Sequence, residues 1–121
     1  MSWDVVMYRF NDYPLKPDAD VEGLERLPLG KVAEVRDLVS AQLPDTEWDS
    51  YYTGYLIGDG FRLDFYVGSH DSEEDDTIDH LDITLHGNPS EAAIDTLLLL
   101  ADPNRWTTQE MTNGMLILPD P

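Results

Sequence analysis

Residues 53–67 read Thr-Gly-Tyr-Leu-Ile-Gly-Asp-Gly-Phe-Arg-Leu-Asp-Phe-Tyr-Val, and this stretch decides the fold. At its centre, Asp59-Gly60 is typical of a two-residue type I′ hairpin turn, because both central positions of that turn require a positive φ. The turn sets the register: Leu56 pairs with Leu63, Gly54 with Phe65 and Tyr52 with Val67 on one face, and Ile57 with Arg62, Tyr55 with Asp64 and Thr53 with Tyr66 on the other. The first face is apolar and the second is mixed, which predicts a sheet covered on one side only.

Three further regions show the alternation of strands. They are Trp3–Phe10, Thr77–His86, and a terminal hairpin of Trp106–Met111 and Met115–Leu118 around Asn113-Gly114, in which Met111 would pair with Leu116. The polar positions of Thr77–His86 would continue the mixed face of the first hairpin. We therefore expect one open sheet surface that carries Arg62, Asp64, Tyr66, His80, Asp82, Thr84 and His86.

Two segments have the apolar periodicity of helices. The first is Lys31–Leu43, which Pro44 ends because a proline disfavours helical geometry at the residue before it. The second is predicted to begin at Asn88-Pro89-Ser90-Glu91, with Asn88 as its cap, and to end at Asp102-Pro103-Asn104. Residues 11–30 contain three prolines, so we expect an irregular connection with room for one helical turn after Val21.

Together these elements predict an α+β fold in the order β-α-β-β-β-α-β-β. We expect a two-layer sandwich in which a mainly antiparallel sheet of about six strands carries two helices on one face. The chain has 121 residues and shows no internal repeat or linker. A single domain spanning residues 1–121 is therefore expected.

The composition is strongly acidic. Asp and Glu number 25 against 7 Lys and Arg, which gives a net charge of −18. A field of this sign repels nucleic acid and anionic membranes, and it favours a basic protein as partner. Two other interpretations stay open, namely that the charge maintains solubility or that it reflects the proteome of a salt-rich host.

The cysteine content, the N-terminal residues and the length of the apolar runs bear on the cellular compartment. Cysteine is absent, which excludes disulfides and thiolate metal sites. The first six residues lack the basic and apolar regions of a signal peptide, and the apolar run Leu97–Ala101 is too short to span a bilayer. We therefore expect a cytoplasmic protein without a membrane anchor.

Catalytic and metal-binding patterns are weak. No spacing of nucleophile and base matches a catalytic motif, so we predict that the protein is not an enzyme and uses no cofactor. The spacing of Asp71, Glu73, Asp75, Asp79 and Asp82 resembles a calcium loop, but Asp76 occupies the position that needs glycine. A small metal-binding protein or hydrolase that uses His80, Asp82 and His86 is the alternative function, although no fourth ligand accompanies them. No metal ligand is assigned.

Three surfaces are candidates for contact with a basic partner. Trp48-Asp49 combines an aromatic anchor with a carboxylate, although packing of Trp48 under its own loop is the other interpretation. The segment Asp71–Asp76 is the densest run of carboxylates and is expected to be solvated and mobile. The third surface is the open sheet face, and the carboxylates of the Asn11–Gly30 connection are an additional candidate. The predicted partner-binding residues are Trp48, Asp49, Tyr66, Asp71, Glu73, Glu74, Asp75, Asp76, His80 and Asp82.

Several short pieces of the sequence resemble a group of small acidic bacterial proteins, few of which are characterised. The pieces are Met1-Ser-Trp-Asp-Val-Val, Pro28-Leu29-Gly30, Trp48-Asp49, Gly58-Asp-Gly with Phe65 and Gly68, Leu85-His86-Gly87 and Trp106. Proteins of this size and charge resemble immunity proteins of polymorphic and contact-dependent toxin systems. The resemblance implies an inhibitor that binds a toxin, and it assigns no role to an individual residue.

These observations lead us to expect a binding module that is a monomer or a weak dimer. Its acidic surface would occlude the active site of a basic toxin domain, such as a nuclease, by pairing with the Lys and Arg side chains that hold phosphate. Attraction between the opposite charges would speed the encounter, and a few aromatic anchors would hold the complex.

Overall fold

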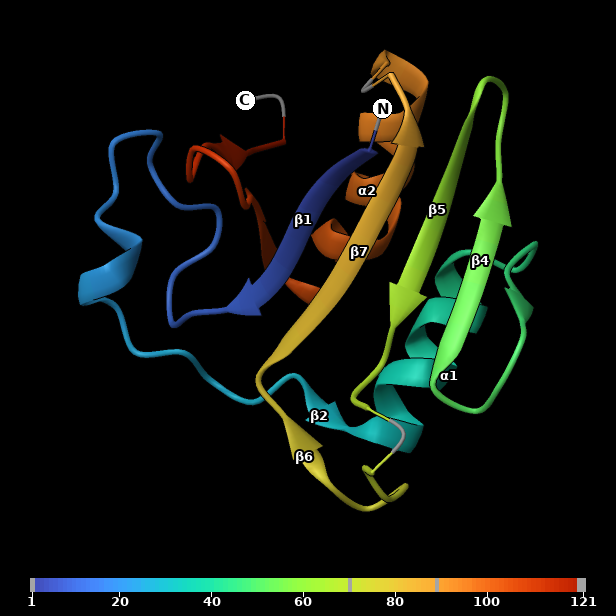
Figure 1. Ribbon diagram of the computed structural model, residues 1–121. Helices are drawn as coiled ribbons and strands as arrows, with labels where there is room; N and C mark the ends of the chain where they lie inside the picture. Colours follow the sequence, from blue (N-terminus) through green and yellow to red (C-terminus); the bar gives the residue numbers. More distant parts are fainter. Residues whose placement is uncertain (1, 70, 89, 120–121) are drawn as a thin grey trace.

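The computed structural model describes residues 2–69, 71–88 and 90–119, and it contains a seven-stranded antiparallel sheet (Figure 1). The strand order is β3-β4-β5-β7-β1-β8-β9. The bounds are β1 Ser2–Arg9, β3 Glu47–Trp48, β4 Thr53–Ile57, β5 Phe61–Tyr66, β7 His80–Gly87, β8 Trp106–Glu110 and β9 Leu116–Ile117. A separate two-stranded sheet pairs β2, Gly30–Lys31, with β6, Thr77–Ile78.

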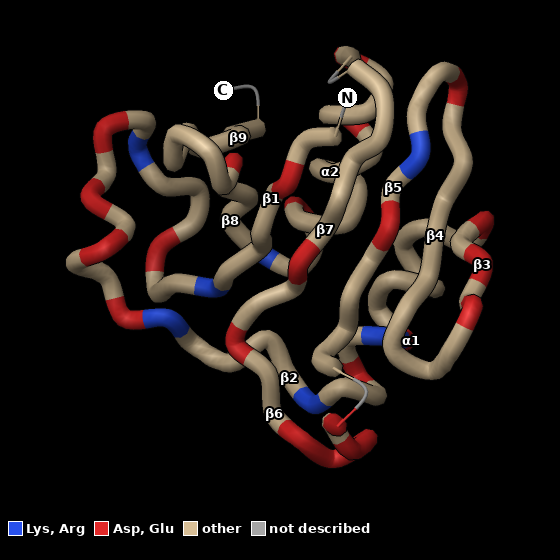
Figure 2. The backbone as a smooth tube through the Cα atoms, viewed as in Figure 1, with Lys and Arg blue, Asp and Glu red and all other residues tan. Residues whose placement is uncertain are grey.

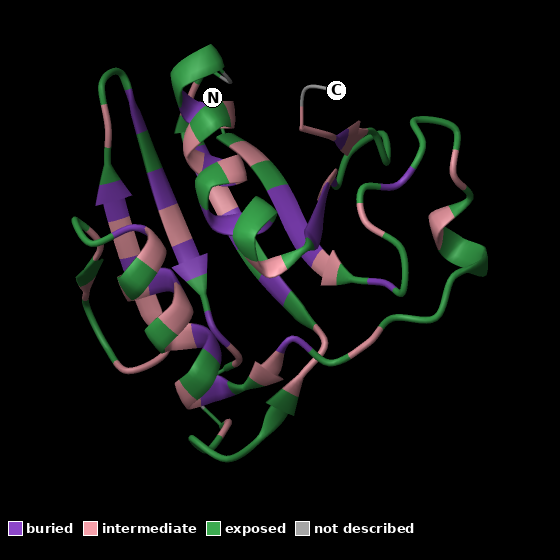
Figure 3. Ribbon diagram, turned by 180° about the vertical axis from the view of Figure 1, so that it is seen from behind, coloured by how far each residue is buried: buried purple, intermediate pink, exposed green. Residues whose placement is uncertain are grey.

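Both helices, α1 (Val32–Gln42) and α2 (Glu91–Asn104), cover the same face of the large sheet (Figures 1 and 3). The predicted α+β fold with a mainly antiparallel sheet is therefore confirmed. The sheet is wider than expected because of β3 at its edge. Like β2 and β6, this strand has only two residues, which is too short for a recognisable alternation.

The central hairpin has the register that Asp59-Gly60 predicts, but its turn is not the predicted type I′, because Gly60 has a positive φ of 83° and Asp59 does not have a positive φ. Leu56 pairs with Leu63 and Tyr55 with Asp64, while the N–H of Gly58 donates to the carbonyl of Phe61 at 2.9 Å. Strand β7 then pairs with β5 and β1 pairs with β7, so the first strand of the chain lies inside the sheet. This order places the two faces of β5, β7 and β1 in continuous surfaces.

The covered face forms the hydrophobic core. Its side chains on β1, β5 and β7 alternate with those of the open face, and each is at most 1% exposed: Val5, Met7, Leu63, Phe65, Leu81, Ile83 and Leu85. The helices contribute fully buried residues to the same cluster, among them Val32, Val35, Val39, Ala93 and Leu97. Burying one such side chain contributes roughly 1.5–3 kcal/mol, so this face holds the sheet and the helices together.

The terminal hairpin differs from the prediction. Strand β8 ends at Glu110, and Gln109 rather than Met111 pairs with Leu116. The buried carboxylate of Glu110 accepts the N–H groups of Thr112 and Asn113 at 2.9 and 2.8 Å. These bonds stabilise a longer turn than Asn113-Gly114 alone would form, because they satisfy backbone donors inside the turn.

The second helix also begins later than predicted. Ser90 is its cap, and the Ser90 hydroxyl accepts the N–H of Ala93 at 3.3 Å. The predicted role of Pro89 falls outside the described residues. At the other end Pro103 lies within the last turn, and Arg105 ends the helix in the left-handed conformation with φ 58°.

Residues 11–29 pack beside β1 as an irregular connection, with one 3₁₀ turn at Val21–Gly23. The N–H of Leu27 donates to the carbonyl of Arg9 at 2.8 Å. Earlier in the connection, the Tyr13 hydroxyl donates to Asp102 at 2.6 Å. Burial, together with this carboxylate, raises the pKa of Tyr13. The connection is thereby attached both to the sheet and to the end of α2.

Candidate functional site

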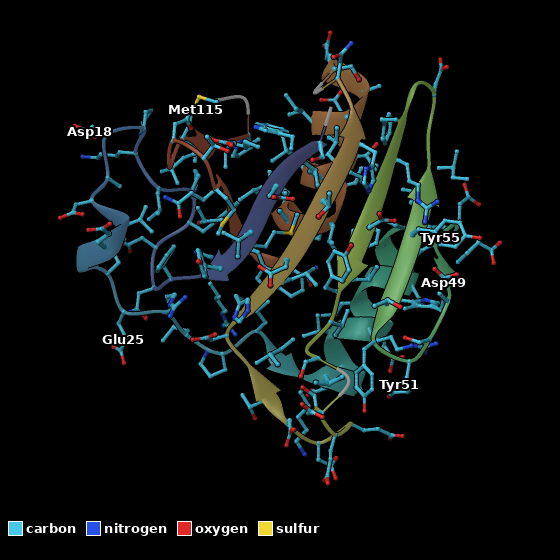
Figure 4. All side chains as sticks on the ribbon, in the orientation of Figure 1. Asp18, Glu25, Asp49, Tyr51, Tyr55 and Met115 are labelled. Carbon is cyan, nitrogen blue, oxygen red and sulfur yellow. The ribbon has the colours of Figure 1, made fainter. Side chains whose placement is uncertain are left out.

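The open face of the sheet carries the polar residues that the sequence predicts for it. Across β5 and β7, Arg62 pairs with His86, Asp64 with Thr84 and Tyr66 with Asp82. Neither helix covers this face (Figures 1 and 3). In Figure 4 it lies between the β4 edge, marked by Asp49 and Tyr55, and the opposite side, marked by Glu25 and Met115.

Asp64 is the centre of one polar group on this face. Its carboxylate accepts the Arg62 Nε–H at 2.8 Å and the His86 Nε2–H at 2.6 Å. The hydrogen bond to Asp64 raises the pKa of the Arg62 guanidinium. The Asp64 side chain is only 16% exposed, so two donors that share one partly buried carboxylate leave it little capacity to bind a partner.

His80 and its neighbours form a second group at the start of β7. The His80 Nδ1 lies 2.8 Å from the Asp79 carboxylate, and its Nε2 lies 3.5 Å from the Asp82 carboxylate. The hydrogen bond from His80 lowers the pKa of Asp79, and the charge of Arg26 acts in the same direction. The longer distance to Asp82 is outside good hydrogen-bond geometry.

The alternative metal site is not supported by this arrangement. His80 and His86 are six positions apart on β7, so their Cα atoms are separated by about 20 Å. His86 pairs instead with Asp64. Among the described residues, no group of three or more His, Asp or Glu side chains is arranged to hold a metal ion.

A cavity of about 400 Å³ lies on the open face, between the end of β5 and the first half of β1. Its lining residues are Asp4, Val5, Tyr66, Asp82, Ile83, Thr84 and Met111. The Tyr66 and Met111 side chains at this cavity are 40% and 55% exposed, so the fold does not bury them. The Asp4 carboxylate accepts a hydrogen bond from the Thr84 hydroxyl at 3.0 Å. This bond orients the Asp4 side chain at the cavity.

Asp4 and Met111 were not among the predicted binding residues. They reach the site through long-range pairing, since Asp4 lies opposite Thr84 and the N–H of Met111 donates to the carbonyl of Asp4 at 2.9 Å. The even-numbered positions of the first strand place Asp4 on the same face as Tyr8. That pattern is readable in the sequence, but the neighbour of the strand is not.

Trp48 is used within the molecule. Its indole Nε1–H donates to the Ser40 hydroxyl at 3.0 Å, and the Arg36 guanidinium lies 4.5 Å from the ring centroid. A Cβ on Gly54 would come within 2.8 Å of the indole ring, which shows how closely the two strands pack. The neighbouring Asp49 is exposed at this edge of the sheet (Figure 4).

The acidic segment 71–76 is attached to α1. The carbonyls of Asp76 and Glu74 accept the N–H groups of Val32 and Ala33 at 2.8 and 3.1 Å, and the Tyr52 hydroxyl donates to the carbonyl of Ser72. Helix N-termini carry unpaired N–H groups and a positive dipole end, so a segment of this charge is stabilised there. The sequence predicted only a solvated and mobile segment and did not predict this capping role. The carboxylates of the segment are exposed, as expected.

The candidate residues therefore fall into three separate groups. Trp48-Asp49 lies at the β3 edge, and Asp71–Asp76 lies at the start of α1. Only Tyr66, His80 and Asp82 share the open face.

The chain shows no match to a protein-family model, to a curated protein or to a solved structure. Among the described residues, no helix has the length and apolar character needed to cross a membrane. The function must therefore be argued from the geometry and charge of the chain itself.

Proposed function

We propose that this protein is an acidic binding module for a basic protein. The observation that carries the proposal is the combination of a net charge of −18 with a sheet face that neither helix covers and that holds exposed aromatic and carboxylate side chains around a cavity. The resemblance to immunity proteins suggests that the partner is a toxin domain, such as a nuclease, whose active site the module occludes.

The charge supports attraction over a wide surface. Carboxylates lie on the sheet, on the connection 11–29, on the segment 71–76 and beside β3 (Figure 2). Seven Lys and Arg residues cannot neutralise 25 acidic ones. Such a surplus accelerates the encounter with a basic protein, and the acceleration falls as salt screens the field.

The open face supports the contact itself. A sheet packed against two helices is rigid, so little ordering cost accompanies binding. Exposed aromatic side chains and carboxylates are suited to the Lys and Arg side chains with which a nuclease holds phosphate. Occupation of those side chains would exclude the nucleic acid without any chemical step.

The test uses the product of the open reading frame adjacent to the gene of this chain. We expect that product to be basic and to arrest growth of a test bacterium when expressed alone, and we expect co-expression of this chain to restore growth. The purified pair should bind with a dissociation constant that rises at least about tenfold between about 0.05 and 0.3 M NaCl, because screening shortens the reach of the charges.

A product that neither binds this chain nor loses toxicity in its presence contradicts the proposal. Tight binding that is indifferent to salt would retain the binding module but exclude the electrostatic mechanism.

A further inference from the structure

Tyrosine, aspartate and arginine recur together on the open face. On β4 and β5, Tyr55 lies directly opposite Asp64. Arg62 completes this group, with its guanidinium 4.5 Å from the Tyr55 ring centroid and its Nε–H bonded to Asp64 at 2.8 Å. One arginine thus contacts an aromatic face and a carboxylate at once.

The same combination occurs at the start of β7. The Arg26 guanidinium lies 4.9 Å from the centroid of the Tyr8 ring. The same side chain lies 3.7 Å from the Asp79 carboxylate. This arginine comes from the connection 11–29, so a segment outside the large sheet docks onto its open face through this contact.

A third tyrosine and aspartate lie between these two groups. Tyr66 on β5 is directly opposite Asp82 on β7, as Tyr55 is opposite Asp64. Here the cavity of about 400 Å³ adjoins the pair, and none of the described residues that line it is basic. The lining includes a second carboxylate, Asp4, and the exposed thioether of Met111.

We propose that the cavity bounded by Tyr66, Asp82, Asp4 and Met111 binds an arginine side chain of the basic partner. This inference rests on the proposed function, and it names the surface and the residue that the partner uses. The guanidinium lies over the Tyr66 ring and donates to Asp82, repeating the geometry of Arg62 with Tyr55 and Asp64. Met111 packs against the apolar stem of the arginine.

Arginine suits this cavity better than lysine does. A guanidinium is planar, weakly hydrated and able to stack on a ring while it donates to a carboxylate at its edge. An ammonium is a compact and strongly hydrated charge. Among the described residues, the cation–ring contacts within the chain all involve an arginine: Arg26, Arg36 or Arg62.

Asp82 keeps capacity for a new donor. The His80 Nε2 lies 3.5 Å from the Asp82 carboxylate, whereas the other ring nitrogen of His80 donates to Asp79 at 2.8 Å. Asp4 is held by one hydroxyl, and a carboxylate has about four acceptor positions. The cavity can therefore bind a cation without breaking a strong bond of the fold.

The direct test is an NMR titration of the full chain with N-acetyl-arginine methylamide. We expect shifts concentrated at the backbone amides of Asp4, Tyr66, Asp82, Thr84 and Met111. The neutral isostere N-acetyl-citrulline methylamide should produce no such shifts, and N-acetyl-lysine methylamide should produce weaker ones. Comparable shifts from the lysine probe, or shifts spread evenly over all acidic segments, would overturn the assignment.

Variants separate the site from general charge. Asp82→Asn and Tyr66→Leu should each reduce the response to the arginine probe at least about tenfold, as removal of a contact that dominates binding does. Asp95→Asn removes the same charge from an exposed position on α2 and should leave the response unchanged. If Asp82→Asn and Asp95→Asn behave alike, the cavity is not the site.

The protein partner distinguishes this inference from the function on which it rests. If the adjacent gene product binds the chain and Asp82→Asn does not weaken that binding, the function stands and the assigned surface is wrong. If the arginine probe binds at the cavity but no basic protein does, the site stands and the function is wrong.

Discussion

The two faces of one strand, β5, differ sharply in burial. Phe65 is fully buried between the sheet and the helices, whereas the next residue, Tyr66, points to the open face and is 40% exposed. Both residues are aromatic, and the register set by the Asp59-Gly60 turn determines the face on which each one lies. The difference shows that the side chains of the covered face build the core, whereas those of the open face remain in contact with solvent.

The open face is nevertheless ordered. Its side chains form short polar groups, such as Asp64 with Arg62 and His86. Exposed ion pairs of this kind contribute about 0–1 kcal/mol each. The core of the covered face therefore fixes the position of the open face, and the polar groups of the open face add little to the stability of the fold. Such an arrangement is favourable for a binding surface.

The largest effect should come from truncating Phe65, with the neighbouring Tyr66 as the comparison. We expect Phe65→Ala to lower the free energy of unfolding by about 3–5 kcal/mol, because it leaves a cavity in the core. Tyr66→Ala should change it by less than about 1 kcal/mol. Urea denaturation monitored by tryptophan fluorescence measures both. A Tyr66→Ala effect as large as that of Phe65→Ala would mean that the open face also contributes to the core.

An intermediate effect is expected at Glu110, the acidic residue of the covered side. It is 2% exposed, and the N–H groups of Asn113 and Thr112 lower the pKa of its carboxyl. A carboxylate with a lowered pKa contributes its full stability above the unfolded value of about 4.3, and this contribution is lost as the pH falls through the lower folded value.

Glu110→Gln should therefore lower the melting temperature at pH 7, because each carboxylate oxygen of Glu110 accepts one of the two N–H groups, whereas glutamine keeps one acceptor oxygen and places an NH2 donor against the other N–H. The difference between wild type and variant should shrink as the solution is acidified below the usual pKa of glutamate. Asp82→Asn on the open face is the matched control and should leave the melting temperature nearly unchanged. Thermal unfolding followed by circular dichroism across this pH range provides the comparison. An unchanged difference at low pH would contradict the role of the charge.

The smallest effect should be that of salt on stability. Repulsion among the surplus carboxylates destabilises the folded chain. Moderate NaCl should therefore raise the melting temperature slightly and reach a plateau at a few tenths molar, where the screening length is only about 5 Å. A rise that continues steeply into molar salt would instead support the interpretation of the acidity as an adaptation to a salt-rich host.

The parts of the fold that follow from local chemistry were predictable. Asp59-Gly60 predicts a two-residue loop, so the register of the hairpin and its two faces follow from adjacent residues. The turn type did not follow, because Gly60 alone takes the positive φ that a type I′ turn needs at both positions. Asn113-Gly114 is the same kind of turn sequence, but the register predicted from it is wrong. The buried carboxylate of Glu110 accepts two N–H groups of the turn and stabilises a longer one. A side chain outside the turn thus outweighed the local preference.

The candidate site was predictable only in part. Tyr66, His80 and Asp82 share a face through the period of two along each strand. Asp4 and Met111 join them through strand neighbours that are far apart in the sequence, and no periodic pattern encodes which strands are neighbours. The capping of α1 by the segment 71–76 is likewise a contact between backbone groups, and a pattern of side chains does not predict such a contact.

The two edges of the large sheet are strands of two residues each, β3 and β9. Long uncovered edges invite strand-by-strand polymerisation, because their free backbone groups pair with those of another molecule. Edges this short offer few such groups. We therefore expect little edge-to-edge association between copies of the chain, and we expect a partner to contact side chains rather than to extend the sheet.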